Sequence, residues 1–199
     1  MGWLRRLRLG LVPNWSLSYV IPLGGSKPTL KERLDQKRKE GGIMDFDYAV
    51  EKVMEIEGGY VNDPTDPGGE TKFGISKRTF PQEDIFNLTR DRARELYLHH
   101  YWLPGKCAQL PKRLRLIYFD MCVLHSQFTA VKVLQRALNG AGISTVVDGI
   151  LGEATLKNAT YLEPERLRAY RVLRIARIVI AKPSQEKFWF GWYKRASQV

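Results

Sequence analysis

The chain has 199 residues, of which 44% are hydrophobic and 11% aromatic, and its formal net charge is +11. This composition excludes an intrinsically disordered chain and is sufficient for a well-filled core, so we expect one folded domain as the default. The positive charge favours polyanionic partners such as nucleic acid, anionic membrane or a bacterial wall that carries carboxylates and phosphates, and charge alone does not choose among them.

The first 43 residues differ from the rest. They contain nine Lys or Arg and three Asp or Glu, a net charge of +6, which leaves only +5 for residues 44–199. Their most apolar stretch, residues 7–23, is interrupted by charged residues and prolines, so we predict no membrane-spanning helix. The codons for Lys39-Glu40-Gly41 can spell a purine-rich run like a bacterial ribosome-binding site. We therefore expect translation to begin at Met44, with residues 1–43 a leader or a disordered extension.

The first predicted helix begins at Asp45. Phe46, Val50 and Val53 recur at helical spacing, and the following Gly-Gly pair is typical of a helix end. Glu57 continues the same apolar stripe into the last turn. Burial and the negative end of the helix dipole would both favour its protonated form, which a general acid requires. A glutamate that turns outward at a frayed helix end is the alternative.

The next stretch is rich in Pro, Gly and Asp and predicts turns that lead into a small β-hairpin around residues 71–75. Asp66 lies nine residues after Glu57, and Thr71 five residues further on. Glycoside hydrolysis needs a proton donor and a second carboxylate, and a threonine hydroxyl can hold the water. Asp63 is a rival for the second carboxylate.

The remainder of the chain predicts helices separated by prolines and glycines. Their expected ranges are residues 90–102, 114–124, 129–139, 153–159, 164–180 and 185–195. The predicted fold class is therefore mostly α, an α+β domain with one small hairpin beside its first helix.

The stretch "EGGYVNDPTDPGGETKFGIS" resembles the signature of the glycoside hydrolase family 108 muramidases, which include phage endolysins and related bacterial enzymes. In this resemblance the family's presumed catalytic glutamate falls on Glu57. The family's Asp-x-Gly-Gly-x-Thr stretch falls on Asp66, Gly68, Gly69 and Thr71. The order of the three catalytic candidates is also similar to that of phage-type lysozymes, which implies a lysozyme-like fold and an inverting reaction.

Two later stretches extend the resemblance. "YFDMCVLHSQFTAVKVLQRALN" resembles a helical segment of the family, and "VDGILGEATL" resembles a motif of its C-terminal peptidoglycan-binding-like region. The resemblance implies a catalytic region over residues 44–139 and a helical peptidoglycan-binding-like region over residues 140–199, packed on the same domain. Residues 124–127 depart from the asparagine and glycine usual in the family, which puts a substrate contact there in doubt.

Substrate-binding residues are predicted beside the catalytic ones. Tyr60, Tyr101 and Trp102 are aromatic side chains that could stack on sugar rings, with core packing as the alternative for each. Gly69, which falls in the stretch that resembles the family's Asp-x-Gly-Gly-x-Thr motif, is also predicted to bind substrate.

Other polar residues receive less specific interpretations. Cys107 and Cys122 are interpreted as core thiols, and Asp148 and Gly149 as a turn before a helix. The three histidines lack acidic partners at a metal-binding spacing, so we predict no metal and no cofactor. Arginines that repeat every three residues predict a basic helix face, which is either solvated or bound to an anionic wall polymer: Arg168, Arg171, Arg174 and Arg177.

The resulting prediction is a monomeric N-acetylmuramidase that acts on peptidoglycan, with Glu57 as general acid. Asp66 and Thr71 either position water or stabilise the oxocarbenium-like transition state. A lytic transglycosylase and a non-catalytic peptidoglycan-binding protein remain alternatives. Nucleic-acid binding rests on charge alone and is not predicted. We expect the protein to remain in the cytoplasm until a separate holin-type protein releases it to the periplasm and cell wall.

Overall fold

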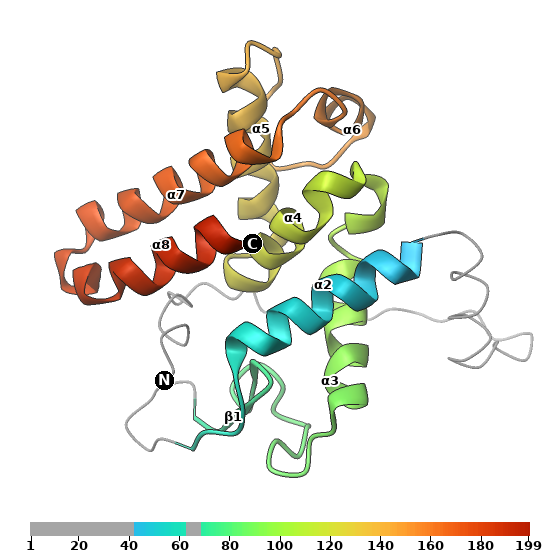
Figure 1. Ribbon diagram of the computed structural model, residues 1–199, viewed down its shortest axis with the longest axis vertical. Helices are drawn as coiled ribbons and strands as arrows, with labels where there is room; N and C mark the ends of the chain where they lie inside the picture. The colour runs from blue at the N-terminus through green and yellow to red at the C-terminus, as the bar shows by residue number, and fades with distance from the viewer. Residues whose placement is uncertain (1–41, 63–68) are drawn as a thin grey trace, which may run out of the picture.

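The computed structural model describes residues 42–62 and 69–199, and within these ranges the chain is mostly helical with one small antiparallel sheet (Figure 1). The α-helices are α2 (Gly42–Glu57), α3 (Arg90–Tyr97), α4 (Lys112–Leu124), α5 (Gln127–Gly140), α6 (Glu153–Ala159), α7 (Pro164–Ala181) and α8 (Trp189–Gln198). The strands are β1 (Thr71–Lys72) and β2 (Ile75–Ser76), and the shorter helical turns are η1 (Leu98–Trp102), η2 (Cys107–Gln109) and η3 (Pro183–Phe188). The predicted α+β class is confirmed. The expectations for residues 1–41 lie outside the described ranges.

Helix α2 forms as its apolar stripe predicts. Phe46, Val50 and Val53 are buried in the core. The helix ends where Gly58 adopts a positive φ of 81°, and the Gly58 amide donates to the carbonyl of Met54 at 3.2 Å. A left-handed residue after the last turn is a common helix C-terminus because it satisfies a carbonyl that the helix leaves unpaired.

The hairpin follows α2 closely. Strand β1 pairs with β2 so that Thr71 is opposite Ser76 and Lys72 is opposite Ile75. Val61 forms an isolated bridge with Thr71 through two backbone hydrogen bonds of 2.9 Å. The chain that leaves α2 is therefore tied to the hairpin.

Helix α4 is central to the fold, because nine of its thirteen residues are buried and it packs against α2, α5 and α7. One core cluster extends from Phe46 in α2 to Leu167 in α7. A smaller cluster joins the end of α4 to α7 and α8 through residues such as Ile175 and Trp192. Figure 1 shows the hairpin and α3 at one end of the long axis and α5 and α6 at the other, with α7 and α8 running antiparallel at the side.

Two predicted helices are corrected in detail. The segment 90–102 is α-helical only to Tyr97 and continues as a π-helical turn over residues 98–102. The helix predicted over residues 185–195 starts later, because Pro183–Phe188 form a 3₁₀ turn and α8 begins only at Trp189. Proline cannot supply the amide hydrogen that would continue α7, so the chain turns there.

Two further predictions concern the thiols and membrane segments. Cys107 and Cys122 are free and buried, as predicted, and burial raises the pKa of the Cys107 thiol. Within the described part of the chain, no helix combines the length and the apolar character that a membrane crossing requires.

Candidate active site

Glu57 is the last residue of α2, and its side chain points inward with 13% of its surface exposed. Its Oε1 atom accepts a hydrogen bond of 2.8 Å from Nη1 of Arg195 in α8. The inward orientation predicted from the stripe is confirmed, whereas the cation beside it was not foreseen.

Arg195 belongs to a buried ionic network. Its side chain is 2% exposed, and it also donates from Nε to Oδ1 of Asp120 at 3.0 Å and from Nη2 to the same carboxylate. Asp120 is fully buried and forms a second ion pair with Arg171. Burial alone would raise the pKa of Asp120, but the two guanidinium groups outweigh it and hold that pKa below its ordinary value. Asp120 is therefore a carboxylate shared between two arginines.

The hairpin turn packs against Glu57 from another direction. A Cβ atom at Gly74 would lie 2.7 Å from Cγ of Glu57 and even closer to the hydroxyl oxygen of Tyr97. Gly74 also has a φ of 78°, and Tyr97 donates to the carbonyl of Phe73 in the same turn at 3.0 Å. Only glycine combines this conformation with this close approach.

Thr71 lies on the same hairpin and is buried. Its hydroxyl donates to the carbonyl of Gly69 at 3.3 Å, and Gly69 itself has a positive φ of 65°. Thr71 and Gly69 are thus in contact with each other, and the hairpin that carries Thr71 contacts Glu57 through Gly74. Asp66 and the alternative second carboxylate, Asp63, lie outside the described residues, so their predicted roles stay predictions.

Tyr60 follows Glu57 by three residues and is 39% exposed. Its hydroxyl donates to Oε1 of Glu70 at 2.8 Å, and its ring meets Phe86 edge-on with 5.4 Å between the ring centroids. The ring is therefore fixed and accessible close to the end of α2.

The other two predicted aromatic contacts are placed differently. Tyr101 is partly buried and packs against Tyr97 with 5.6 Å between centroids. Trp102 is only 3% exposed and packs against Phe46 and Phe119 in the core. Trp102 thus has no ring face open to a sugar in this arrangement, which corresponds to the core-packing alternative.

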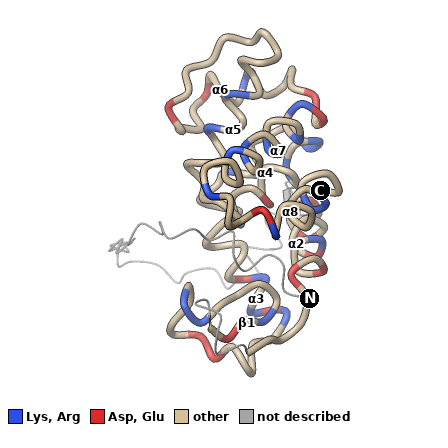
Figure 2. Tube along the Cα trace, turned by 90° about the vertical axis from the view of Figure 1, so that its left-hand side faces the viewer, with Lys and Arg blue, Asp and Glu red and all other residues tan. Residues whose placement is uncertain are grey.

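The predicted basic face on α7 is corrected. Arg171 is buried in the Asp120 network, and Arg168 donates to the backbone carbonyl of Val199 at 2.8 Å. Arg174 is partly buried, which leaves Arg177 as the exposed member. In Figure 2, Lys and Arg occur from the hairpin region to α6 and are interleaved with Asp and Glu.

The "VDGILG" stretch forms a turn before α6, as predicted. Gln135 in α5 donates to Oδ1 of Asp148 at 2.7 Å and to the carbonyl of Ile150 at 3.1 Å, and it accepts from the Gly149 amide at 2.9 Å. The stretch that ends in "LQRALN" and the "VDGILG" stretch are therefore joined through the buried side chain of Gln135.

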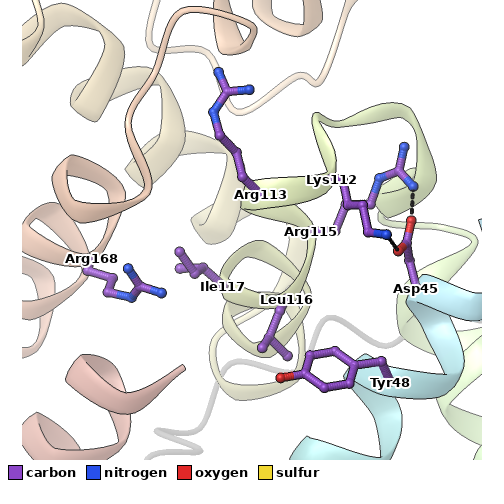
Figure 3. Close-up of a pocket in the computed structure, with 8 residues that line it drawn as sticks. All are labelled: Asp45, Tyr48, Lys112, Arg113, Arg115, Leu116, Ile117 and Arg168. Atoms are coloured by element: carbon purple, nitrogen blue, oxygen red, sulfur yellow. Dashed lines mark hydrogen bonds and ion pairs between the residues drawn. The ribbon is translucent and has the colours of Figure 1, made fainter.

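A hollow of about 210 Å³ lies between the beginning of α2, α4 and α7 (Figure 3). Its lining includes Asp45, which pairs with Lys112 and Arg115, and Tyr48. Tyr48 lies nine residues before Glu57, roughly 14 Å along the helix axis. The hollow is thus at the opposite end of α2 from the candidate catalytic carboxylate. Among residues 42–62 and 69–199, no group of three or more His, Cys, Asp or Glu side chains is arranged to hold a metal ion.

Two residues of the site were missed by sequence reasoning, namely Asp120 and Arg195. The signal for Asp120 was an acid inside the apolar run "YFDMCVL", because a carboxylate on a buried helix needs a cationic partner. The identity of that partner carries no local signal in the sequence.

The chain matches two family models in succession. Residues 50–125 match the family described as Glycosyl hydrolase 108, and residues 129–197 match the one described as Predicted Peptidoglycan domain. Among solved structures it is similar to one titled "Structure of Brucella abortus SagA", with 26% sequence identity, a TM-score of 0.64 and coverage of 77% of this chain and 90% of that chain. A comparison with curated proteins finds no match. Residues 50–125 therefore belong to the glycosyl hydrolase 108 family and residues 129–197 form a peptidoglycan domain, so the protein is a glycoside hydrolase.

Proposed function

We propose that this protein is an N-acetylmuramidase that hydrolyses the β-1,4 bond between N-acetylmuramic acid and N-acetylglucosamine in peptidoglycan. The observation that carries the proposal is the fixed carboxylate of Glu57, which ends α2 between Arg195 and the turn at Gly74. A carboxyl group that is held in one orientation and is still partly exposed suits a general acid.

In the proposed reaction, Glu57 donates its proton to the glycosidic oxygen as the bond to the sugar breaks. Asp66 accepts a proton from a water that attacks the opposite face of the sugar, and Thr71 helps to position that water. The product anomer is then inverted. A product NMR spectrum that shows the original anomer in the first moments of the reaction would instead indicate a covalent intermediate.

The substrate contacts in this proposal come from the segment after α2. The exposed ring of Tyr60 provides a stacking surface, and the backbone at Gly69 provides hydrogen-bonding groups close to Thr71. We further propose that the enzyme is endolysin-like and bacteriolytic, and that a separate membrane-permeabilising protein gives it access to the wall.

The test is digestion of purified peptidoglycan by the wild type and by Glu57→Gln, followed by mass analysis of the released fragments. We expect the wild type to release fragments with reducing muramic acid ends and Glu57→Gln to release none while it still binds peptidoglycan. Anhydro-muramic ends would identify a lytic transglycosylase. Equal behaviour of the two proteins would identify a non-catalytic binder.

Glu55→Gln is the matched control, because Glu55 lies on the same helix but is exposed and pairs only with Lys52 among the described residues. It should retain wild-type activity. Asp66→Asn and Asp63→Asn in the same assay decide which aspartate is the second carboxylate, and we expect only Asp66→Asn to abolish fragment release.

A further inference from the structure

We propose that Arg195 is a positioning residue for Glu57, so that α8 completes the active site that α2 begins. This inference rests on the proposed role of Glu57 as general acid. The two residues are 138 positions apart in the chain, yet they are joined by a hydrogen bond of 2.8 Å between side chains that are 2% and 13% exposed.

The guanidinium of Arg195 divides its donors between two acids. Nε and Nη2 face Asp120, which leaves Nη1 directed at Glu57. Because a guanidinium is planar and rigid, fixing two of its nitrogens on Asp120 also fixes the direction of the third. Asp120 therefore sets where Nη1 points, and Nη1 sets where the Glu57 carboxylate lies.

The charges of the network support the same conclusion. Among the described residues, Asp120 is the single acid that both Arg171 and Arg195 contact, so these three residues carry one surplus positive charge inside the fold. A buried charge is costly unless it is paired. The carboxylate that Glu57 becomes when it gives up its proton balances this surplus, and the hydrogen bond from Nη1 of Arg195 holds the side chain inward.

The arrangement also suits the chemistry of proton donation. As Glu57 gives its proton to the leaving oxygen, negative charge develops on the carboxylate. A donor of fixed direction already lies against one carboxylate oxygen and stabilises that charge without having to reorganise. Gly74 limits movement of the same side chain at Cγ, so the carboxylate is restrained from two directions.

The two family segments meet at this network. Glu57 and Asp120 lie within residues 50–125, whereas Arg195 and Arg171 lie within residues 129–197. The second segment thus supplies a group that orients the catalytic carboxylate, in addition to any contact it makes with peptidoglycan.

The experiment compares Arg195→Gln with Arg171→Gln in the full-length protein, with solubilised glycan strands as substrate. Both substitutions remove a buried arginine from Asp120, but only Arg195 contacts Glu57. We expect both to lower the melting temperature. At a temperature where both are folded, Arg195→Gln should lower kcat about 100-fold with little change in KM, as expected for a misplaced catalytic group. Arg171→Gln removes the surplus charge but leaves the hydrogen bond from Arg195 to Glu57, so its kcat should fall much less than that of Arg195→Gln.

A second pair of variants covers the case in which a glutamine variant does not fold. Arg195→Lys keeps the charge, but a lysine ammonium lacks the rigid, planar donors with which a guanidinium holds Asp120 and Glu57 at the same time. Its kcat should therefore lie between those of wild type and Arg195→Gln. Arg171→Lys should match wild type. Wild type and Glu57→Gln belong in the same assay. If the wild type releases no fragments, the proposed function fails and the inference falls with it. If the wild type is active but the Arg195 and Arg171 variants have equal kcat, only the positioning role of Arg195 is wrong.

Discussion

The backbone of Gly74 lies directly against the side chain of Glu57, so that a methyl group at position 74 would approach Cγ of Glu57 to 2.7 Å. Gly74 thus connects the hairpin to α2 through backbone contact alone. This contact also explains why a glycine with a φ of 78° stands at this turn, since both the conformation and the space exclude a larger residue.

We expect Gly74→Ala to lose most of its activity on peptidoglycan. The added methyl group must displace either the Glu57 side chain or the Tyr97 hydroxyl, because both lie too close to the position that it would occupy. Gly142→Ala is the matched control, because Gly142 has the same φ of 78° but no neighbouring atom within 4 Å of its Cβ position. Both variants should lose about 1–2 kcal/mol of stability from backbone strain. Equal activities of the two variants, measured as release of fragments, would show that contact with Glu57 is unimportant.

The sequence predicted the helices well where their apolar spacing was regular. Helix α2 is an example, since its stripe through Phe46, Val50 and Val53 both forms the buried face and directs Glu57 inward. The prediction of helices from the sequence was less accurate at the helix ends. The π-helical turn after Tyr97 and the 3₁₀ turn at Pro183 depend on how the chain packs locally, which periodicity does not report.

Only those residues of the candidate site that are close together in the sequence could be predicted. Glu57 and Thr71 belong to one short motif, whereas Arg195 reaches Glu57 across 138 residues. No spacing rule within an element can reveal such a contact. The interpretation of Arg171 was wrong for a related reason: residues repeating every three positions rotate around a helix, and this one turns into the core.

Asp120→Asn should destabilise the protein strongly, because it leaves Arg171 and Arg195 buried without their shared acid. Removing one partner of a buried ion pair typically costs about 3–5 kcal/mol. Urea denaturation near neutral pH measures the loss. Asp47→Asn is the control, since Asp47 pairs with Arg94 nearer the surface and should cost at most about 1 kcal/mol. A similar small loss for both variants would contradict the importance of the buried network.

Gln135→Met should loosen the turn before α6. The methionine has a similar shape but cannot hydrogen-bond with Asp148, the Gly149 amide or the Ile150 carbonyl. Groups left unpaired in this way cost roughly 1–3 kcal/mol, so thermal unfolding should occur at a lower temperature. Amide hydrogen exchange should accelerate over residues 145–152. Arg136→Met changes the neighbouring exposed residue and should alter neither measurement.

His125 should make the protein sensitive to mild acid. Burial, with smaller effects from Arg171 and Arg174, lowers the pKa of His125 to about 3 from an ordinary value of 6.5, and its Nε2 atom is buried without a hydrogen-bond partner among the described residues. Above pH 6.5 the imidazole is neutral in both the folded and the unfolded chain, so it contributes no pH dependence. Between pH 6.5 and about 3 only the unfolded chain takes up a proton there, and the free energy of unfolding falls as the pH falls.

The slope from this one group reaches at most about 1.4 kcal/mol per pH unit. We expect His125→Gln to remove that slope, because glutamine takes up no proton in either state. Urea denaturation at a series of pH values from neutral to about 4 measures it for the wild type and the variant. The exposed His99 provides the control, and His99→Gln should keep the wild-type slope. If His125→Gln also keeps that slope, the acid sensitivity arises elsewhere and the imidazole is free to protonate in the folded protein.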